Sequence, residues 1–529
     1  MYTFLIGMVI LLVGGTAYGR ICERIMNPDD RKPPAITKQD GVEYTPMEYW
    51  RNTLLNLINI AGTGPIIGPI QGILFGPIAF ILIPIGNIFG GALHDYFSGM
   101  MAMRNNGAQM PTMIHKLTNK PFYNFYNVFI CFLMLLVGTV FISVPGNLFA
   151  AEAVGISFTP DNVPFSIWII FGVIFAYYLI ATVLPLDKFV ARIYPFLAIV
   201  LLLASIGLGY GLFFEGYITA LEELSWDNWR GIHPHGTPLL PIFFVTVACG
   251  IVSGFHSTQN VLISRYVSSE RQGRMTFYNM MVVEGVIAMF WAAATMALIS
   301  RGLTTVVAGS AETLANSGLE VIRAVTIAPY TTEVLINSEF VFQRPTPVIG
   351  LISRDMLGDV AGMVAIFGVI TLAVTTGDTA LRSLRLMIGE YFGIDQKPVN
   401  TRLAISAVIF AAVAGLLYWS TTNPGGFSIL WRYFAWGNQT LAVFAFAIIT
   451  IYLIARGYTM APYMALLPGA WYMFITTAFI ANAPIGLGLP HFTAIWIGVA
   501  AAIIYSVLVM KQGAKVRDSK IEIETPPQY

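Results

Sequence analysis

Windows of about 20 apolar residues recur along nearly the whole chain and are separated by short polar loops. A helix needs about this length to cross the hydrocarbon core of a bilayer. The pattern therefore predicts about thirteen transmembrane helices, at 3–19, 51–76, 77–103, 123–151, 165–184, 189–214, 238–265, 275–300, 360–389, 403–420, 428–455, 462–481 and 490–511. Two longer connections interrupt the pattern, at 20–50 and 301–354, and short surface helices are expected in the second, at 320–328 and 333–342.

The composition agrees with a polytopic membrane protein. Of the 529 residues, 56% are hydrophobic and 11% are charged, whereas a soluble domain carries about 25% charged residues. The net charge of +1 gives no basic patch for nucleic acid. Cys22, Cys131 and Cys249 have neither the number nor the spacing of a disulfide framework or a zinc site. Residues 3–19 lack a basic leading region and are interpreted as a retained helix, not a signal peptide.

The lysine and arginine positions predict the orientation, because cytoplasmic loops carry an excess of both. If the first helix enters from outside, 23 of the 29 cationic residues fall on the inner side, and these include every lysine. The N-terminus is therefore expected outside and the tail 511–529 in the cytoplasm. The loop-by-loop alternation also supports the predicted number of helices.

Two glycine-rich, polar stretches interrupt apolar segments, at 61–69 and 248–257. Unwound backbone survives at membrane depth only against protein or a water-filled cavity. A pair of such breaks in the two halves of a chain is typical of the binding site of a secondary transporter. The residues at these breaks that we expect to contact a substrate or ion are Gly62, Thr63, Gly64, Pro65, Gly68, Gly250, Ser253, Gly254, Phe255, His256 and Ser257.

The first break is expected to keep 62–69 out of regular helix, because Pro65 and Pro69 each remove an amide donor. The two broken segments run in opposite directions through the membrane, and each opens a set of about five helices. The chain is therefore predicted to contain an inverted repeat, with halves at 51–215 and 237–455. Residues 1–50 would add a leading helix and a linker, and 456–529 would add two helices and a tail.

Intramembrane acids are the candidate coupling groups, because a carboxylate at membrane depth is costly and is functional by default. Asp95 and Asp378 are the two candidates. Asp378 is also one helical turn from Arg382, so a structural ion pair is an equal alternative for it. Thr375 and Thr376 could supply hydroxyl ligands to a sodium ion. Glu284 lies in mid-helix and ranks lower, because neither a break nor a second acid adjoins it in sequence.

Asn438 and Gln439 place two amides inside a later apolar segment. Such amides hold helices together more often than they contact substrate, but both are kept as candidate substrate or ion contacts. There is no phosphate-binding loop and no hydrolase or zinc-protease motif, so transport driven by ATP in this chain, or soluble enzyme chemistry, is not indicated. A channel is disfavoured because the polar residues cluster at two breaks. An enzyme or nutrient sensor embedded in the membrane stays open as the alternative, using His94, Asp95, His256 and Asp378.

The same motifs resemble those of the carbon starvation protein A (CstA) family. The stretch Ala61-Gly-Thr-Gly-Pro-Ile-Ile-Gly-Pro69 is similar to its first signature, and Ala248-Cys-Gly-Ile-Val-Ser-Gly-Phe-His-Ser257 is similar to its second almost residue for residue. Asp95, Asp378 with Arg382, and Asn438-Gln439 also fall on family motifs, whereas Thr63, His94 and the loop 301–354 depart from them. The resemblance covers about residues 50–455.

This resemblance implies an inner-membrane transporter of the amino acid–polyamine–organocation superfamily with a leucine-transporter-type 5+5 inverted repeat. Members are linked to peptide uptake on carbon starvation, and some resemble proton-coupled pyruvate symporters. The expected protein is thus an all-α secondary transporter, not an enzyme. It is expected to import peptides or small carboxylates with protons or sodium, to need no cofactor beyond a possible sodium ion, and to use the insert 301–354 as an outer gate. The substrate, the coupling ion and the oligomeric state stay open.

Overall fold

The computed structural model describes the chain except for residues 42, 157, 159, 184–189, 303, 309–320, 325–330, 344, 397, 520 and 529. The helices of the bundle follow the apolar windows, and several of them are short segments of a longer span. They are α1 (Tyr2–Val9), α2 (Gly15–Met26), α4 (Tyr49–Ile60), α5 (Gly64–Gly72), α6 (Ala79–Gly86), α7 (Leu93–Arg104), α9 (Lys120–Phe149), α10 (Phe165–Val183), α11 (Val190–Phe214), α12 (Leu239–Thr246), α13 (Ala248–Ile251), α14 (His256–Ser264), α15 (Met280–Arg301), α18 (Pro345–Phe392), α19 (Val399–Thr422), α20 (Gly426–Ala455), α21 (Pro462–Asn482) and α22 (His491–Asp518).

Several of these helices join into longer spans. Single π-helical turns connect α1 to α2 (Ile10–Gly14) and α6 to α7 (Asn87–Ala92), and similar turns extend α9 and α15. Among the described residues, nine helices are long and apolar enough to cross a membrane, or ten if the bent pair α4 and α5 counts as one span. This confirms the helical membrane class, while the exact number of thirteen helices stays a prediction.

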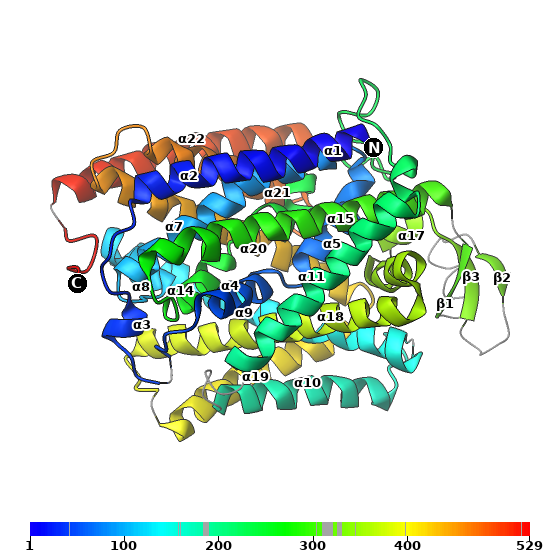
Figure 1. Cartoon of the computed structure of the whole chain (residues 1–529), viewed down its shortest axis with the longest axis horizontal. Coiled ribbons are helices and arrows are strands. Elements are labelled where there is room, and N and C mark those ends of the chain that lie inside the picture. The colour runs from blue at the N-terminus through cyan, green and yellow to red at the C-terminus, as the bar shows by residue number, and fades with distance from the viewer. Residues whose placement is uncertain are drawn as a thin grey trace.

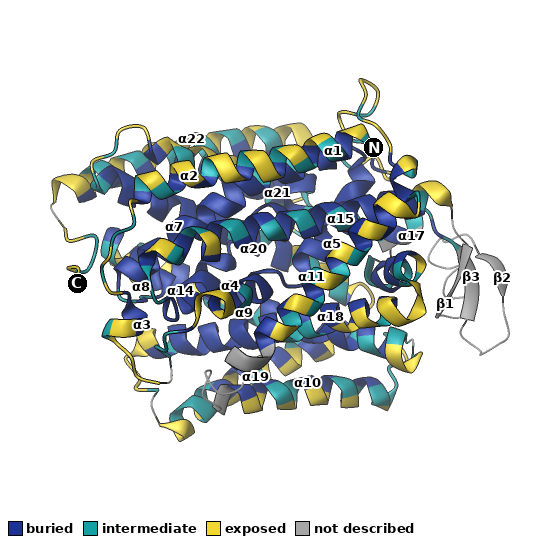
Figure 2. Cartoon of the chain, viewed as in Figure 1, coloured by how far each residue is buried: buried dark blue, intermediate teal, exposed yellow. Residues whose placement is uncertain are grey.

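The helices lie roughly parallel in one bundle, with the N-terminus at one end and the C-terminus at the other (Figure 1). Burial separates central helices from peripheral ones (Figure 2). In the most apolar part of α20, 83% of the residues are buried inside the protein, against 17% in α22. Helices α4, α5, α14 and α15 therefore lie where lipid does not reach, and polar side chains on them contact protein.

One end of the bundle collects the loops that the charge pattern places in the cytoplasm. Arg104, at the end of α7, donates to Glu270 between α14 and α15 at 2.6 and 2.8 Å. Glu524 of the C-terminal segment accepts from Arg31 at 3.0 Å, from Arg104 at 3.3 Å and from Tyr452. The loops group as predicted. Which side of the membrane this end faces stays a prediction.

The opposite end holds the insert between α15 and α18, and one expectation for it was wrong. Residues 320–328 were expected to be helical, but Val321–Ala324 form strand β2 of a three-stranded antiparallel sheet with β1 (Thr304–Ala308) and β3 (Thr331–Leu335). The strands are rich in Thr and Val, whose branching at Cβ favours strand over helix. Of the second expected helix, only α17 (Ser338–Gln343) forms. The predicted outer gate at 301–354 lies partly outside the described residues.

Candidate functional site between two broken helices

The first break is shorter than the sequence suggested. Helix α4 ends at Ile60, Ala61–Thr63 are not helical, and α5 starts at Gly64 with a bend of 47° between the two helices. The expectation that 62–69 avoids regular helix was therefore wrong for 64–69. Pro65 lies in the first turn of α5, where the missing amide has no intrahelical partner to lose, and only Pro69 removes a bond. The hydroxyl of Thr63 is buried at the break and has no hydrogen-bond partner among the described residues.

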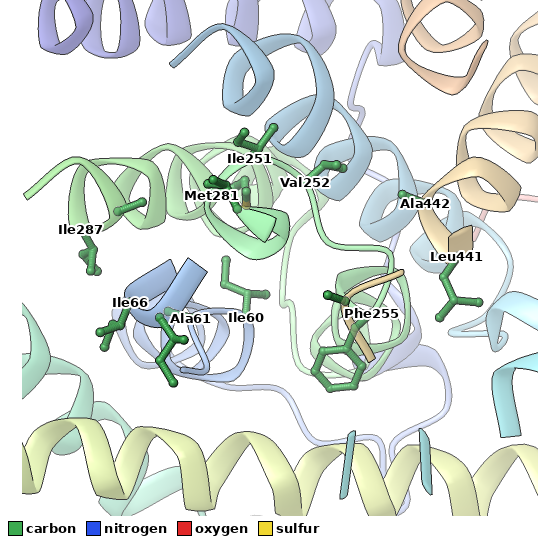
Figure 3. Packing of buried hydrophobic residues seen from close by; sticks show 14 of the residues in the cluster. Ile60, Ala61, Ile66, Ile251, Val252, Phe255, Met281, Ile287, Leu441 and Ala442 are labelled. Carbon is green, nitrogen blue, oxygen red and sulfur yellow. The ribbon is translucent and has the colours of Figure 1, made fainter. Parts of the chain in front are cut away.

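The second break covers Val252–Phe255, between α13 and α14. Gly250 and Ser257, expected within it, lie in the flanking helices instead. Ser257 donates to the Gly254 carbonyl at 2.6 Å and so closes the first turn of α14. Figure 3 shows Val252 and Phe255 along this segment, with Leu441 and Ala442 of α20 beside it.

Asn438 of α20 holds the second break in place. Its side-chain oxygen accepts from the Ser253 hydroxyl at 3.1 Å and from the Phe255 amide at 2.9 Å, and its own carbonyl accepts from the Gly254 amide at 3.2 Å. The neighbouring amide of Gln439 donates to the Phe244 carbonyl of α12 at 2.7 Å. In this structure both amides join helices, and Asn438 satisfies backbone groups that the break exposes.

Glycines let the two broken segments pack closely on each other. Gly64, Gly68 and Gly72 lie one turn apart on the face of α5 that meets 246–249, and an added Cβ at Gly64 or Gly72 would collide with Cys249 or Val247. Ile60, Ala61 and Ile66 border the first break in Figure 3. The two breaks, which are far apart in sequence, therefore lie at one place in the bundle.

A histidine links the breaks directly. His256 is the first residue of α14, and its Nε2 lies 3.1 Å from the carbonyl oxygen of Ile60, the last residue of α4. A carbonyl only accepts, so this contact assigns a proton to Nε2. The Nδ1 atom lies 2.9 Å from Oδ2 of Asp95 on α7. The other Asp95 oxygen lies 2.8 Å from Nδ1 of His94. All three side chains are fully buried.

Glu284 also belongs to this cluster, although its sequence neighbours gave it a low rank. It lies on α15, is fully buried, and places Oε2 3.7 Å from Nε2 of His256. The described residues offer no hydrogen bond to either carboxyl oxygen. The sequence signal was an acid in the middle of an apolar helix, but its nearness to the second break comes from packing between distant segments.

Asp378 is buried, and its polar contacts are with Tyr194 and Arg382 instead of the His256 cluster. Its Oδ2 accepts from the Tyr194 hydroxyl of α11 at 3.0 Å and lies 3.9 Å from Arg382, which donates to the Ala181 carbonyl at 2.7 Å. Thr375 bonds within its own helix. Thr376 donates to the carbonyl of Leu372 at 3.0 Å and lies 3.3 Å from that of Ile58, just before the first break. Of the four candidates on α18, therefore, Thr376 is the one that contacts the broken helix α4 through a hydrogen bond.

The described residues contain no group of three or more His, Cys, Asp or Glu that could hold a metal ion. A sodium site would use hydroxyl and carbonyl oxygens instead, and Thr376 with the Ile58 carbonyl is the pair that fits this chemistry. The site at Thr375 and Thr376 stays a prediction.

The family comparison agrees with the motifs at the breaks. The sequence model described as "Carbon starvation protein CstA" matches residues 1–173 and 160–479. This chain belongs to the CstA family. Among curated relatives, a Helicobacter pylori protein named peptide transporter CstA is 26% identical, over 86% of this chain and 78% of its own length. The pyruvate/proton symporter BtsT of Escherichia coli is 24% identical over the same shares. A Haemophilus influenzae membrane protein without an assigned function is 39% identical over 55% of this chain and 89% of its own.

Solved structures show the fold. MhsT in complex with L-phenylalanine matches with a TM-score of 0.53 at 13% identity, over 88% of this chain and 99% of MhsT. A mutant of the Eremococcus coleocola manganese transporter matches with a TM-score of 0.51 at 11% identity, over 88% and 95%. Both have the leucine-transporter-type fold. The named relatives are transporters and not enzymes. With its many long apolar helices, this chain is a multi-pass membrane protein of the transporter class.

Proposed function

We propose that this protein is a proton-coupled secondary transporter that imports a peptide or a small carboxylate such as pyruvate across the inner membrane by alternating access. The observation that carries the proposal is the bond from His256 to the Ile60 carbonyl. It joins the two broken helices through an imidazole, a side chain that can both donate and accept a proton. A change in protonation would therefore change how the two breaks are held together.

The proposal takes the substrate to lie between the breaks. The N-terminus of α5 at Gly64 carries the positive end of the helix dipole, which favours a carboxylate. The buried Thr63 hydroxyl, which has no partner among the described residues, is available to a substrate oxygen. Peptides and 2-oxo acids both present a carboxylate, so this end of the site suits either. The names of the relatives, peptide transporter and pyruvate/proton symporter, support the same two classes.

Asp95 is proposed to take part in coupling, because it contacts His256 directly. Asp378 then forms a structural pair with Arg382 and Tyr194. Sodium coupling through Thr376 is the competing arrangement, and the two differ in the gradient that drives uptake. The proposal also includes the 5+5 inverted repeat and a cytoplasmic location of the C-terminal tail. It further includes membership of the amino acid–polyamine–organocation superfamily and a role in uptake during carbon starvation. A nutrient sensor built on the same fold is the second candidate function.

The test is uptake by purified protein in liposomes, with labelled pyruvate and short peptides, under an imposed proton or sodium gradient. A thermal-shift screen of peptides and 2-oxo acids comes first, because a bound ligand raises apparent stability by mass action. Accumulation driven by a pH gradient is expected, and it should be lost in Asp95→Asn while the variant still elutes as a folded particle. Full coupled uptake by Asp95→Asn would remove Asp95 from the mechanism. Ligand binding without transport under either gradient would favour a sensor.

A further inference from the structure

The hydrogen-bond partners of His256 indicate which of its ring nitrogens carry a proton. Nε2 carries one proton, because it contacts a carbonyl that only accepts. A second proton lies between Nδ1 and Oδ2 of Asp95, 2.9 Å apart, since two bare acceptors would repel at this distance. Asp95 is well provided with donors, with His94 on its other oxygen. His256 and Asp95 thus form an ion pair, in which the positive imidazolium and the negative carboxylate compensate each other.

Glu284 has no such compensation. Its side chain is fully buried, and both oxygens lack a hydrogen-bond partner among the described residues. An ionised carboxylate in such a place is far more costly than a neutral one. His256 Nε2 lies 3.7 Å from Oε2, and its proton is engaged with Ile60. In this structure Glu284 is therefore neutral and carries a proton of its own.

We propose that Glu284 holds the transported proton and that, once Glu284 is neutral, a second proton on Nε2 of His256 makes the bond between α14 and α4. This inference rests on the proposed function as a proton-coupled transporter. With Glu284 ionised, the imidazolium of His256 passes its Nε2 proton to Oε2. The N–H bond breaks, an O–H bond forms, and the neutral imidazole keeps Nδ1–H on the Asp95 carboxylate. The bond to Ile60 is lost in this state.

A second proton that reaches Nε2 restores the imidazolium. Glu284 is now neutral and no longer competes for this proton, so Nε2–H turns to the Ile60 carbonyl and the bond between the breaks forms. This loaded state is the one that the structure shows in its contacts. The bond between α14 and α4 therefore forms only when Glu284 is neutral and Nε2 of His256 also carries a proton. This would link proton occupancy to the conformation of the substrate site.

The surroundings contain few other groups that titrate. His256, Asp95 and Cys249 face Glu284 from α14, α7 and α13, with His94 behind Asp95. Helices α5 and α6 and the turn Asn87–Ala92, which pack on α15, contain no titratable residue. The titratable residues of α4, Tyr49 and Arg51, lie at its far end. Further elements that pack on α15 carry titratable residues with partners of their own: Tyr194 of α11 donates to Asp378 of α18, Tyr217 donates to Asp355 of α18, and Arg274 pairs with Glu23.

Glu284→Gln tests the proposal, because glutamine keeps the shape and imitates the permanently neutral acid. Two measurements in liposomes separate coupling from substrate handling: accumulation driven by a pH gradient, and exchange of labelled for unlabelled substrate without any gradient. Exchange is expected to stay within about twofold of wild type, while pH-driven accumulation falls to the level without a gradient. The exposed acid Glu48, changed to glutamine, serves as the matched control and is expected to match wild type in both.

Accumulation by Glu284→Gln equal to wild type would overturn the role of Glu284, and so would loss of exchange together with accumulation. If the glutamine variant does not purify as a folded particle, Glu284→Asp keeps an ionisable group, and retained pH-driven accumulation is expected. Exchange without any pH-driven accumulation in that variant would contradict the proposal. A wild-type protein that neither accumulates nor exchanges substrate would instead refute the proposed transport function. Uptake driven by sodium alone would leave transport intact and overturn Glu284 as its proton carrier.

Discussion

Gly254 lies where the second break meets α20, and replacing it with alanine gives a sharp test of how the break is held. An added Cβ would lie less than 3.0 Å from the Asn438 carbonyl oxygen, the Ala442 amide nitrogen and Leu441 Cβ, whereas ordinary contact starts at 3.4 Å. Two of these atoms are backbone, so a rotamer change cannot make room. Either the break or α20 has to move.

The expected loss of stability follows from two contributions. Overpacking in a filled interior costs roughly 1–3 kcal/mol. The displaced segment would also weaken the 3.2 Å bond from the Gly254 amide to Asn438, which adds about 1 kcal/mol. The sum is about 2–4 kcal/mol. Gly415→Ala is the matched control, because it lies inside α19 with no atom within 4 Å of an added Cβ. There alanine should stabilise by about 0.5–1 kcal/mol through its higher helix propensity.

The assay is thermal unfolding of both variants in the same detergent, followed by uptake in liposomes. Gly254→Ala should melt below wild type and transport poorly, while Gly415→Ala should melt at or slightly above wild type with normal transport. The reasoning is refuted if Gly254→Ala melts at the wild-type temperature, because the close approach of the break to α20 would then not exist.

Two further predictions follow from contacts at the second break and in the loop before α12. Asn438→Ala should destabilise the protein by about 2–4 kcal/mol, since it leaves the buried Phe255 amide unpaired and loses the Ser253 bond. Asn438→Asp keeps the accepting oxygen and should melt closer to wild type, and equal melting of both variants would contradict the clamp. In the loop before α12, burial and then nearby His235 lower the pKa of His233 to about 4. Below its unfolded pKa of about 6.5 the unfolded chain binds a proton that the folded chain does not, so stability should fall from about pH 6.5 to 4. The fall should be smaller in His233→Gln, and identical pH profiles of the two proteins would refute this.

The sequence predicted the helical class and both breaks, because glycine, proline and polar side chains in the middle of an apolar segment disfavour an uninterrupted helix. It overestimated the extent of the breaks. A proline in a first turn looks like a helix breaker in sequence, yet Pro65 begins α5 without losing a bond. The helix expected in the insert was also wrong, because the Cβ-branched Val321 and Ile322 favour the strand that 321–324 forms.

Within the candidate site, His256 and Asp95 could each be named from their intramembrane position, but the bond between them could not. They are 161 residues apart, and only the packing of α7 against α14 brings them together. Glu284 was undervalued for the same reason, because its sequence neighbours are apolar. For Asn438 both a substrate contact and a helix-joining role were open, and the substrate contact stays a prediction. The structure shows Asn438 joining α20 to the second break. Its partners, the amide and hydroxyl groups of the break, became known only from the fold.

The glycine contacts of α5 divide the site into two mechanical parts. Among the described residues, Gly64, Gly68 and Gly72 bring α5 close to the segment 246–249, in which Cys249 is the one titratable residue. We therefore expect these two segments to move together whatever the protonation state of His256. The opposite half-helices, α4 and α14, meet at the level of the breaks through the imidazole of His256. Close packing thus joins one pair of half-helices, whereas the other pair also shares a hydrogen bond that requires a proton on Nε2 of His256.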